Sequence, residues 1–278
     1  MNTGEIIHML RKNKGMSQLE LAKNITTRRS IGEVEHGYKD LPYTTMIKII
    51  QRLGISLSNF EEYRQGHQFS ADQALINEFE SISDTSEVKK MKSILKKARQ
   101  LEEKSTLRYI HYIICVLDAL IHVDTYNCDQ LTNLVKPVWN ELSTVSVWNH
   151  TDLFIINNLL YIFDFQTALR IGKKIITKLN QYGDNNVLLQ NAIYSNLAFI
   201  NMTNSNAFGK SITINYLQKS IELTKHAHRY DLLLLSKIRL AMVLQQYEEA
   251  KKMCSILTRM GANNIVNLVY QDFPILVT

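Results

Sequence analysis

A short charged segment, TTRRSIGEVEHG at residues 26–37, surrounds two aliphatic side chains with two arginines, two glutamates and a histidine. An arginine can donate two parallel hydrogen bonds to O6 and N7 of guanine in the major groove of DNA, and a glutamate can accept one from the amine of cytosine. The segment therefore has the side chains of a helix that reads DNA. A charged helix that only faces solvent would carry the same side chains, so the neighbouring sequence has to distinguish the two.

A helical wheel at about 100° per residue divides the segment into two sides. The inward side comprises Thr27, Ile31, Val34 and Glu35. The outward ridge comprises Arg29, Glu33 and His36, preceded by Arg28 and Ser30. Gly32 also faces outward, at a cost of about 0.5–1 kcal/mol relative to alanine. That cost is understandable if another molecule has to approach the backbone closely.

The residues before this segment predict another short helix beside it. Ser17 and Glu20 have the spacing of a capping box, in which each side chain accepts a hydrogen bond from the backbone amide of the other residue. Two short helices that meet across a tight turn form the arrangement in which the second helix enters a major groove. This context favours DNA reading over the solvent-facing alternative.

Five short helices are predicted within residues 1–65. The expected helix starts are Thr3, Ser17, Thr26 or Thr27, Thr44 or Thr45, and Ser58; the expected stops include Gly15, Gly37 and Gly54. The polar segment RQGHQ at residues 64–68 has no apolar stripe and predicts a boundary. We therefore expect one domain over residues 1–65 and a second over residues 66–278.

The second domain is predicted to be a succession of helices joined by short connections. They are expected near residues 70–82, 86–103, 106–122, 128–146, 151–163, 165–181, 185–202, 209–228, 230–246 and 247–260. Repeated helix pairs are typical of an α-solenoid, although the tetratricopeptide consensus is not evident. An irregular helical bundle is the alternative.

The N-terminal motif resembles the helix-turn-helix of the phage-repressor-like (Xre) family. SQLELAKNITTRRSIGEVEHG, from Ser17, contains the SQxxLA pattern, a turn and a helix that ends in ExG. The turn is one residue shorter than in most Xre proteins, a departure shared by the Rgg (MutR-like) regulators of Gram-positive bacteria. LPYTTMIKIIQRLGISLSNF and VWNHTDLFIINNLLYIF are also similar to Rgg sequences, with Thr151 where tyrosine is common and Asp152 in place of the usual glutamate. The implied fold is all-α: a small five-helix Xre-type domain, then a solenoid of degenerate tetratricopeptide-like helix pairs.

The resemblance implies a set of DNA-contact residues: Gln18, Arg28, Arg29, Ser30, Glu33, His36, Lys39, Tyr43 and Thr44. The two arginines stand where base-reading side chains begin, whereas Glu33 either accepts from a cytosine or orients a neighbouring arginine. Residues around the next helix start would hold phosphates, because free amides at a helix N-terminus favour anions. Glu35 points inward, and we expect it to pair with Arg11 as a structural brace.

For the second domain the resemblance implies a receptor for a short signalling peptide. Asparagine can both donate to and accept from an extended peptide backbone. The expected peptide-binding residues are Asn158, Tyr161, Arg170, Tyr194 and Asn196, although asparagine is also common on solvated helices. A domain that binds a partner protein, a small molecule or a metal is the alternative.

The family implication is a homodimer on a near-palindromic site in double-stranded DNA, with half-sites about 34 Å apart or a multiple of that. Residues 1–66 hold ten Lys or Arg against seven Asp or Glu, so one domain alone should bind DNA weakly. RNA polymerase is a possible further partner of the DNA-bound dimer. No cofactor is expected.

The remaining motifs argue against an enzyme, a metal site and a membrane protein. There is no HExxH, phosphate loop or GxSxG motif. His111, Cys115, Asp118 and His122 share one helix face but extend over about 16 Å, too far to converge on one tetrahedral ion. The three scattered cysteines suit a reducing cytosol, and the most apolar window, IHYIICVLDALIHV, is too short to span a bilayer. We therefore expect a cytoplasmic protein.

Overall fold

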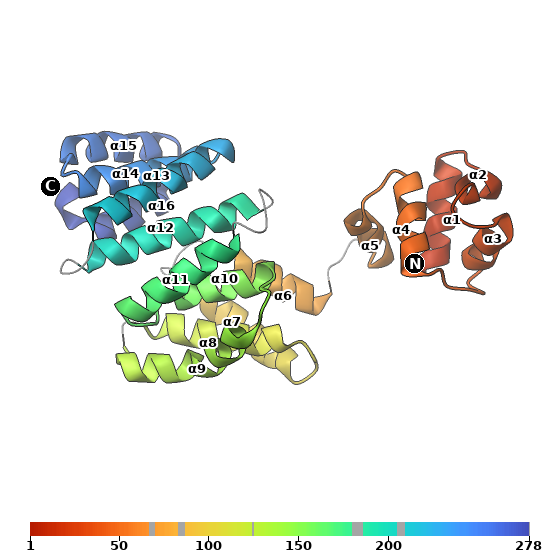
Figure 1. The fold of residues 1–278 in the computed structure, drawn as a ribbon, viewed down its shortest axis with the longest axis horizontal. Helices are drawn as coiled ribbons and strands as arrows, with labels where there is room; N and C mark the ends of the chain where they lie inside the picture. The colour runs from red at the N-terminus through yellow and green to blue at the C-terminus, as the bar shows by residue number, and fades with distance from the viewer. Residues whose placement is uncertain (67–69, 83–86, 124, 180–185, 205–208, 278) are drawn as a thin grey trace. The chain divides into compact units, whose positions relative to one another are not determined.

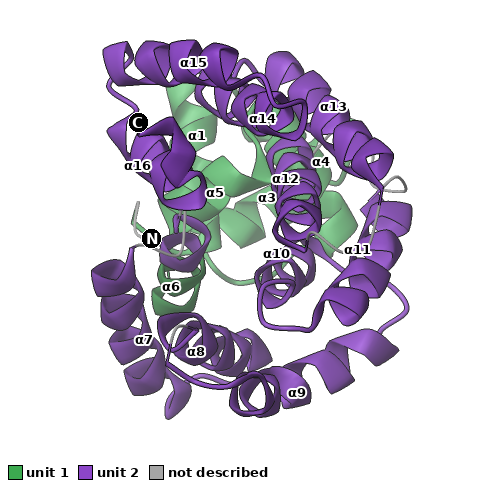
Figure 2. Ribbon diagram, turned by 90° about the vertical axis from the view of Figure 1, so that its left-hand side faces the viewer, with its two compact units in different colours: residues 1–76 green, residues 77–278 purple. Residues whose placement is uncertain are grey.

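The computed structural model of the chain describes residues 1–66, 70–82, 87–123, 125–179, 186–204 and 209–277. The regular elements in these ranges are all helical, sixteen α-helices and a short 3-10 helix (Figure 1), so the all-α prediction is confirmed. The chain divides into two compact units, residues 1–76 and 77–278 (Figure 2). No helix in the described ranges is both long and apolar enough to cross a membrane.

Unit 1 contains the five expected short helices. They are α1 (Thr3–Asn13), α2 (Gln18–Ala22), α3 (Arg28–Glu35), α4 (Tyr43–Arg52) and α5 (Leu57–Arg64). Each contributes apolar residues to one core: Ile6, Ile7, Leu10, Leu21, Ala22, Ile31, Val34, Ile49, Ile50, Leu53 and Phe60. Burial of this shared stripe stabilises helices that are too short to persist alone.

The predicted helix starts are partly right. The capping box of Ser17 and Glu20 is present, and Thr27 caps α3. Three other starts were wrong: Asn2 caps α1 in place of Thr3, α4 begins at Tyr43 in place of Thr44 or Thr45, and Ser56 caps α5 in place of Ser58. Asn2 caps α1 because Glu5 completes a capping box with it. Helix α4 follows Pro42 directly and has no side-chain cap hydrogen bond, so neither threonine marks its start.

The remaining helices lie close to the predicted ranges. They are α6 (Ala71–Glu80), α7 (Val88–Glu102), α8 (Arg108–Ile121), α9 (Cys128–Thr144), α10 (His150–Leu159), α11 (Phe165–Leu179), α12 (Val187–Thr203), α13 (Lys210–His226), α14 (Tyr230–Val243) and α15 (Tyr247–Arg259). The prediction omitted α16 (Asn263–Asp272) and the 3-10 helix η2 (Pro274–Leu276). Three asparagines give α16 a low helix propensity, but its apolar residues pack into a core shared with α14 and α15.

Helices α7–α16 form a curved, two-layered array in unit 2. In Figure 2 the even-numbered helices α8–α16 line the inner side, and the odd-numbered helices α7–α15 cover the outside. Hydrogen bonds connect successive inner helices, from Asn157 of α10 to Asn196 of α12, and from Ser195 of α12 to Arg239 of α14. This stacking of helix pairs is the solenoid arrangement that the repeated helices predict.

Trp148 anchors the corner between α9 and α10. Its ring is fully buried, and its Nε1 atom donates to the carbonyl of Leu142 at 2.7 Å. The ammonium groups of Lys174 and Lys178 of α11 lie 5.1 and 4.7 Å from the ring centre. The tryptophan therefore joins three consecutive helices by burial, a hydrogen bond and cation–π contacts.

Candidate functional site

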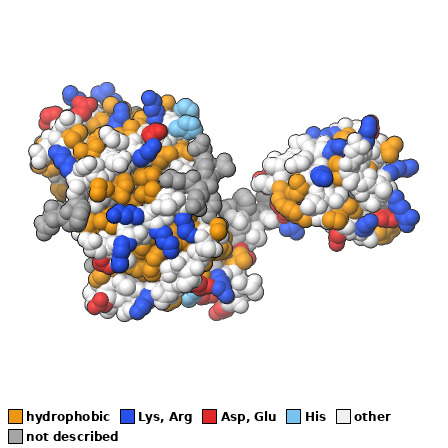
Figure 3. Space-filling model, viewed as in Figure 1, with side chains coloured by type: hydrophobic (Ala, Val, Ile, Leu, Met, Phe, Trp, Pro, Cys, Tyr) orange, Lys and Arg blue, Asp and Glu red, His pale blue; other side chains and the backbone are white. Residues whose placement is uncertain are grey.

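On the outward ridge of α3, the side chains of Arg28, Arg29 and His36 are exposed, and those of Ser30 and Glu33 are partly buried. Ile31 and Val34 are buried in the core of unit 1, whereas the side chain of Arg29 is 87% exposed. Arg28 is also exposed at the start of the helix. Figure 3 shows Lys and Arg side chains, with a few acidic ones, at the end of unit 1 formed by α2 and α3. The ridge can therefore enter a groove without any rearrangement of the core.

Glu33 organises the cations of this ridge. Its Oε1 atom accepts a hydrogen bond from Nε of Arg29 at 2.7 Å, and its Oε2 atom lies 3.9 Å from Nζ of Lys39. The hydrogen bond from Arg29 lowers the pKa of Glu33. Among the residues that the structure describes, only Nε of Arg29 has a hydrogen-bond partner, so its two terminal nitrogens remain available as the donor fork that fits guanine. The geometry matches the second of the two roles considered for Glu33, the orientation of a neighbouring arginine.

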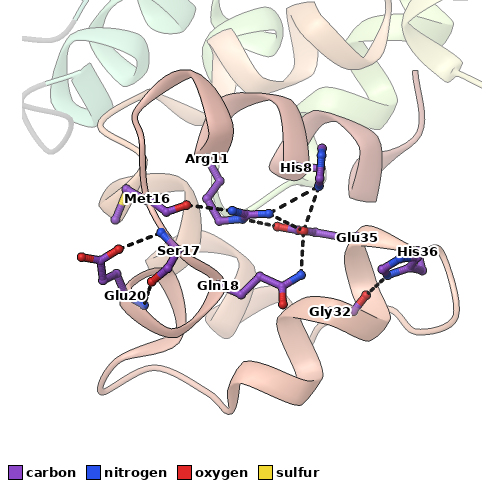
Figure 4. A network of polar contacts seen from close by, with 9 residues as sticks. All are labelled: His8, Arg11, Met16, Ser17, Gln18, Glu20, Gly32, Glu35 and His36. Carbon is purple, nitrogen blue, oxygen red and sulfur yellow. Dashed lines mark hydrogen bonds and ion pairs between the residues drawn. The ribbon is translucent and has the colours of Figure 1, made fainter.

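A buried ion pair fixes α3 against α1. Arg11 donates from Nε to Oε1 of Glu35 at 2.5 Å and from Nη2 to Oε2 at 2.8 Å (Figure 4). Its Nη1 atom donates to the carbonyl of Met16 at 2.7 Å. Nδ1 of His8 and Nε2 of Gln18 each lie 3.0 Å from Oε2 of Glu35. The expected Arg11–Glu35 pair is thus present, within a larger network.

The electrostatics of Glu35 reflect two opposing effects. Burial disfavours the charged carboxylate, but hydrogen bonds from Arg11, Gln18 and His8 outweigh burial and lower the pKa of Glu35 to about 2. The carboxylate is therefore ionised at neutral pH, and its oxygens are occupied by donors from α1 and α2. This network connects α1, α2 and α3 through polar contacts in addition to the apolar core.

Gln18 and Gly32 meet where α2 approaches α3 (Figure 4). The Gln18 amide nitrogen is held by Glu35, and both amide heteroatoms lie 3.7 Å from where a Cβ atom on residue 32 would stand. That distance is ordinary van der Waals contact, so unit 1 itself does not require glycine there. The packing within unit 1 therefore does not explain the glycine.

Arg52 is a positioning residue that the sequence motif did not reveal. It lies at the end of α4, and its Nη1 atom donates to the carbonyl of Lys23 and, at 3.4 Å, to those of Glu20 and Leu21. These carbonyls lie at the end of α2, where the helix leaves them without partners. Asn24 follows with φ of 60°, in the left-handed region. Arg52 thus stabilises the short turn although it lies 29 residues away from Lys23 in the sequence, a contact that no local pattern indicates.

The other predicted DNA contacts surround the end of α3 and the start of α4. Ser30 takes part in the cap, since its amide and hydroxyl both contact the hydroxyl of Thr27. His36 is exposed, its Nδ1 atom lies 2.7 Å from the carbonyl of Gly32, and its ring stacks with that of Tyr38. Lys39, Tyr43 and Thr44 are exposed next to the amides that open α4. All nine predicted residues therefore belong to α2, α3, the α3–α4 connection or the first turn of α4.

In unit 2 the structure brings together two of the five predicted peptide-binding residues. Tyr161 donates from its hydroxyl to Oδ1 of Asn196 at 2.6 Å, and Nδ2 of Asn196 donates to Asn157 at 3.0 Å. Burial raises the pKa of Tyr161 to about 12, so its hydroxyl stays protonated. The contacts of the other three are with different residues. Asn158 donates to the carbonyl of Phe154, Arg170 donates to Thr167, and the ring of Tyr194 contacts that of Tyr216.

A buried arginine continues this polar line along the inner helices. Arg239 of α14 is 4% exposed, donates to Oγ of Ser195 at 2.8 Å and to Oδ2 of Asp272 at 3.2 Å, and stacks over the ring of Phe199. Its Nε atom has no hydrogen-bond partner among the described residues. The sequence signal was an arginine within the apolar run LLLLSKIRLAMV, which our prediction overlooked. Amide, hydroxyl and guanidinium groups from α10, α12 and α14 therefore form hydrogen bonds with one another between the inner helices.

The histidine and cysteine residues of α8 are engaged in other contacts. His111 pairs with Glu102, and Asp118 pairs with Arg99. Burial raises the pKa of Cys115 to about 11, which makes its thiolate scarce at neutral pH. Within the described ranges, no three His, Cys, Asp or Glu side chains lie close enough together to hold a metal ion.

Comparison with known proteins identifies unit 1 and the fold of the whole chain. Residues 7–60 match the family HTH_3, described as Helix-turn-helix. The whole fold is similar to a putative transcriptional regulator from Listeria monocytogenes EGD-e, with a TM-score of 0.76, 17% identity, and coverage of 99% of this chain and 97% of the other. No curated protein is significantly similar to the chain in sequence.

Two further solved structures share the fold. The SHP pheromone receptor Rgg2 from Streptococcus dysgalactiae has a TM-score of 0.68 at 15% identity, covering 97% of this chain and 98% of the other. PlcR from Bacillus thuringiensis, in complex with the peptide PapR7 and DNA, has a TM-score of 0.67 at 15% identity, covering 95% and 98%. At these identities the similarity establishes the fold.

Proposed function

We propose that this chain, a DNA-binding helix-turn-helix transcription regulator, binds a short signalling peptide on the inner side of unit 2 and controls a promoter as a homodimer. The observation that carries the DNA part is the braced α3, with Arg28 and Arg29 exposed on a helix that Glu35 connects to α1 and α2. A rigid helix loses little conformational entropy when it enters the groove, so its contacts translate into affinity.

The peptide part of the proposal is supported by the chemistry of the inner side. An extended peptide backbone can form hydrogen bonds with the amide groups of Asn196 and Asn158 and with the Tyr161 hydroxyl. Its apolar side chains can pack against the Phe199 ring. The solved relatives named as a pheromone receptor and as a peptide complex have the same fold. Among the residues predicted from sequence, we place most weight on Tyr161 and Asn196, because they lie together; Asn158, Arg170 and Tyr194 remain proposed contacts.

Base reading is tested by comparing two cations of the same surface. A target duplex is first obtained by in vitro selection with the full-length protein, and binding is then measured on it and on a random duplex. Arg29→Ala should weaken binding to the selected duplex by about 1–3 kcal/mol and binding to random DNA much less. Lys39→Ala should weaken both alike, as loss of a phosphate contact does. Equal losses for Arg29→Ala on both duplexes would refute base reading by this arginine.

Peptide binding is tested by thermal shift with short peptides encoded next to the gene. A peptide present at 100 times its dissociation constant should stabilise the protein by about 2.7 kcal/mol. Tyr161→Phe, which removes one hydroxyl, and Asn196→Ala should reduce that shift, whereas Asn140→Ala on the exposed side of α9 should leave it unchanged. No shift with any of these peptides, together with a response to a protein, a small molecule or a metal, would replace the peptide proposal by the alternative.

A further inference from the structure

Helix α7 carries most of the excess positive charge of the chain. It contains six Lys or Arg residues and one acidic residue, Glu102, whereas the whole chain has a formal net charge of +6. Its buried side, Met91, Ile94, Leu95 and Ala98, packs into unit 2, so the cations lie on the remaining surface. This concentration of charge lies outside the helix-turn-helix domain, and the proposed DNA and peptide contacts do not use it.

Some of these cations are neutralised locally, and others are not. Lys90, Lys97 and Arg99 pair with Glu87, Glu78 and Asp118. Lys92, Lys96 and the following Lys104 are exposed and form no ion pair with any acidic residue that the structure describes. Lys92 and Lys96 are also i,i+4 neighbours, so their like charges repel each other on the helix surface. A polyanion that binds there would remove this repulsion.

The surface that carries these three lysines is an open groove along one helix. A cavity of about 750 Å³ is lined by Lys92, Leu95, Lys96, Arg99, Gln100, Glu103 and Lys104, all from α7 and the residues that follow it. Lys92 and Lys104 are separated by roughly 18 Å at the rise of an α-helix. An elongated, open site whose lining carries four cations and one carboxylate, that of Glu103, fits a polyanionic strand better than an enclosed small ligand.

We propose that Lys92, Lys96 and Lys104 form a second, sequence-independent contact for the phosphate backbone of DNA. The inference rests on the DNA binding of unit 1, because the connection between the units limits how far unit 2 can lie from the bound duplex. The chain between Arg64, at the end of α5, and Lys92 can span no more than roughly 70 Å, about two turns of duplex. Such a contact would supply electrostatic affinity that the modest charge of residues 1–66 lacks.

The decisive measurement is the salt dependence of DNA binding by the full-length protein. The variant Lys92→Gln/Lys96→Gln/Lys104→Gln is compared with Lys173→Gln/Lys225→Gln/Lys237→Gln, three exposed lysines elsewhere in unit 2 that also form no ion pair with described residues. Both variants lose the same charge. The slope of log K against log salt should become less steep by about 0.9 for each lost phosphate contact, hence by about 2–3 in the α7 variant only.

The outcomes separate this contact from the proposed function. The α7 variant should lose affinity for selected and random duplexes by the same factor and keep its preference for the selected one. If both variants have the wild-type slope while specific binding persists, the α7 contact is refuted and the proposed function stands. If the α7 variant changes only the thermal shift with a peptide, the lysines bind an acidic ligand and the DNA contact is equally refuted. If the wild-type protein binds no duplex, both proposals fall.

Discussion

Each unit buries an arginine, but the two arginines are satisfied to different degrees. In unit 1 all three nitrogens of Arg11 donate hydrogen bonds, to Glu35 and to the carbonyl of Met16. In unit 2 Arg239 donates to Ser195 and Asp272, while its Nε atom has no partner among the described residues. The network of unit 1 is therefore complete in the free protein, whereas the network of unit 2 retains unused hydrogen-bonding capacity.

This difference suggests different tasks for the two networks. A complete buried network holds its helices in one geometry, which suits a domain that has to present α3 to DNA without rearranging. A partly satisfied network costs stability in the free protein, and a bound group that completes it recovers that cost. The following predictions are ordered from the largest expected effect to the smallest, and each can contradict this contrast.

Removal of the acidic partner should affect unit 1 more than unit 2. Glu35→Gln leaves a buried guanidinium without its carboxylate, and we expect a loss of about 3–5 kcal/mol in the free energy of unfolding of unit 1. Asp272→Asn should cost less, because the Asp272 side chain is 12% exposed and Arg239 keeps Ser195. Both tryptophans lie in unit 2, so tryptophan fluorescence follows that unit and far-ultraviolet circular dichroism follows both.

The exposed pair of Glu61 and Arg64 supplies the control for this comparison. Glu61→Gln should change the stability of unit 1 by no more than about 0.5 kcal/mol, because both partners remain solvated. If Asp272→Asn lowers the free energy of unfolding as much as Glu35→Gln does, the two networks contribute equally to stability and the contrast between them is wrong.

A fall in pH should also affect the stability of the two units differently. The pKa of Glu35 falls from 4.5 to about 2 on folding, so its contribution is present above pH 4.5 and is lost as the pH falls toward 2, at a cost on the order of 3 kcal/mol. In unit 2 burial raises the pKa of Asp152, so protonation of this group favours folding and acidification relieves its burial cost. Unfolding curves between pH 5 and about pH 2 should therefore show destabilisation of unit 1 that Glu35→Gln abolishes. An unchanged pH profile in the variant would exclude Glu35 as the cause.

Substitution of two buried glycines, Gly4 in unit 1 and Gly172 in unit 2, tests how rigidly each unit is packed. A Cβ atom at Gly4 would lie 2.0 Å from the carbonyl oxygen of Val34, which belongs to the backbone of α3. One at Gly172 would lie 2.3 Å from the tip of the Leu197 side chain. Gly4→Ala should therefore cost about 1–3 kcal/mol or more, and Gly172→Ala less, since a side chain can repack. Chemical denaturation of both variants measures the difference, and a larger loss at Gly172 would reverse the assignment of rigidity.

Gly32 gives the smallest effect and the sharpest test of the DNA surface. Gly32→Ala meets only ordinary contacts in unit 1, so it should stabilise the free protein by about 0.5–1 kcal/mol through helix propensity. Its binding to the selected duplex should nevertheless weaken if DNA approaches the α3 backbone closely. Unchanged binding by the stabilised variant would show that the glycine is not needed for contact.

Much of unit 1 could be predicted from sequence, because its signals are local. The capping box of Ser17 and Glu20, the apolar spacing in α3 and the pairing of Arg11 with Glu35 all follow from short-range patterns or from the inward position of one glutamate. The starts of α1, α4 and α5 were misplaced by one or two residues because several residues there can serve as caps. Helix α16 was missed because its propensity is low and its packing is not local.

The sequence by itself determined that the chain is helical, that its N-terminal part contains a helix-turn-helix motif, and that α3 places its arginines on the outward side. Only the tertiary structure decided that Arg52 stabilises the end of α2, that Tyr161 meets Asn196, and that Arg239 joins Ser195 to Asp272. The physical reason is separation along the chain. Caps and helical stripes involve residues within one or two turns, whereas these contacts join residues 29 to 44 positions apart, which only the packing of whole helices brings together.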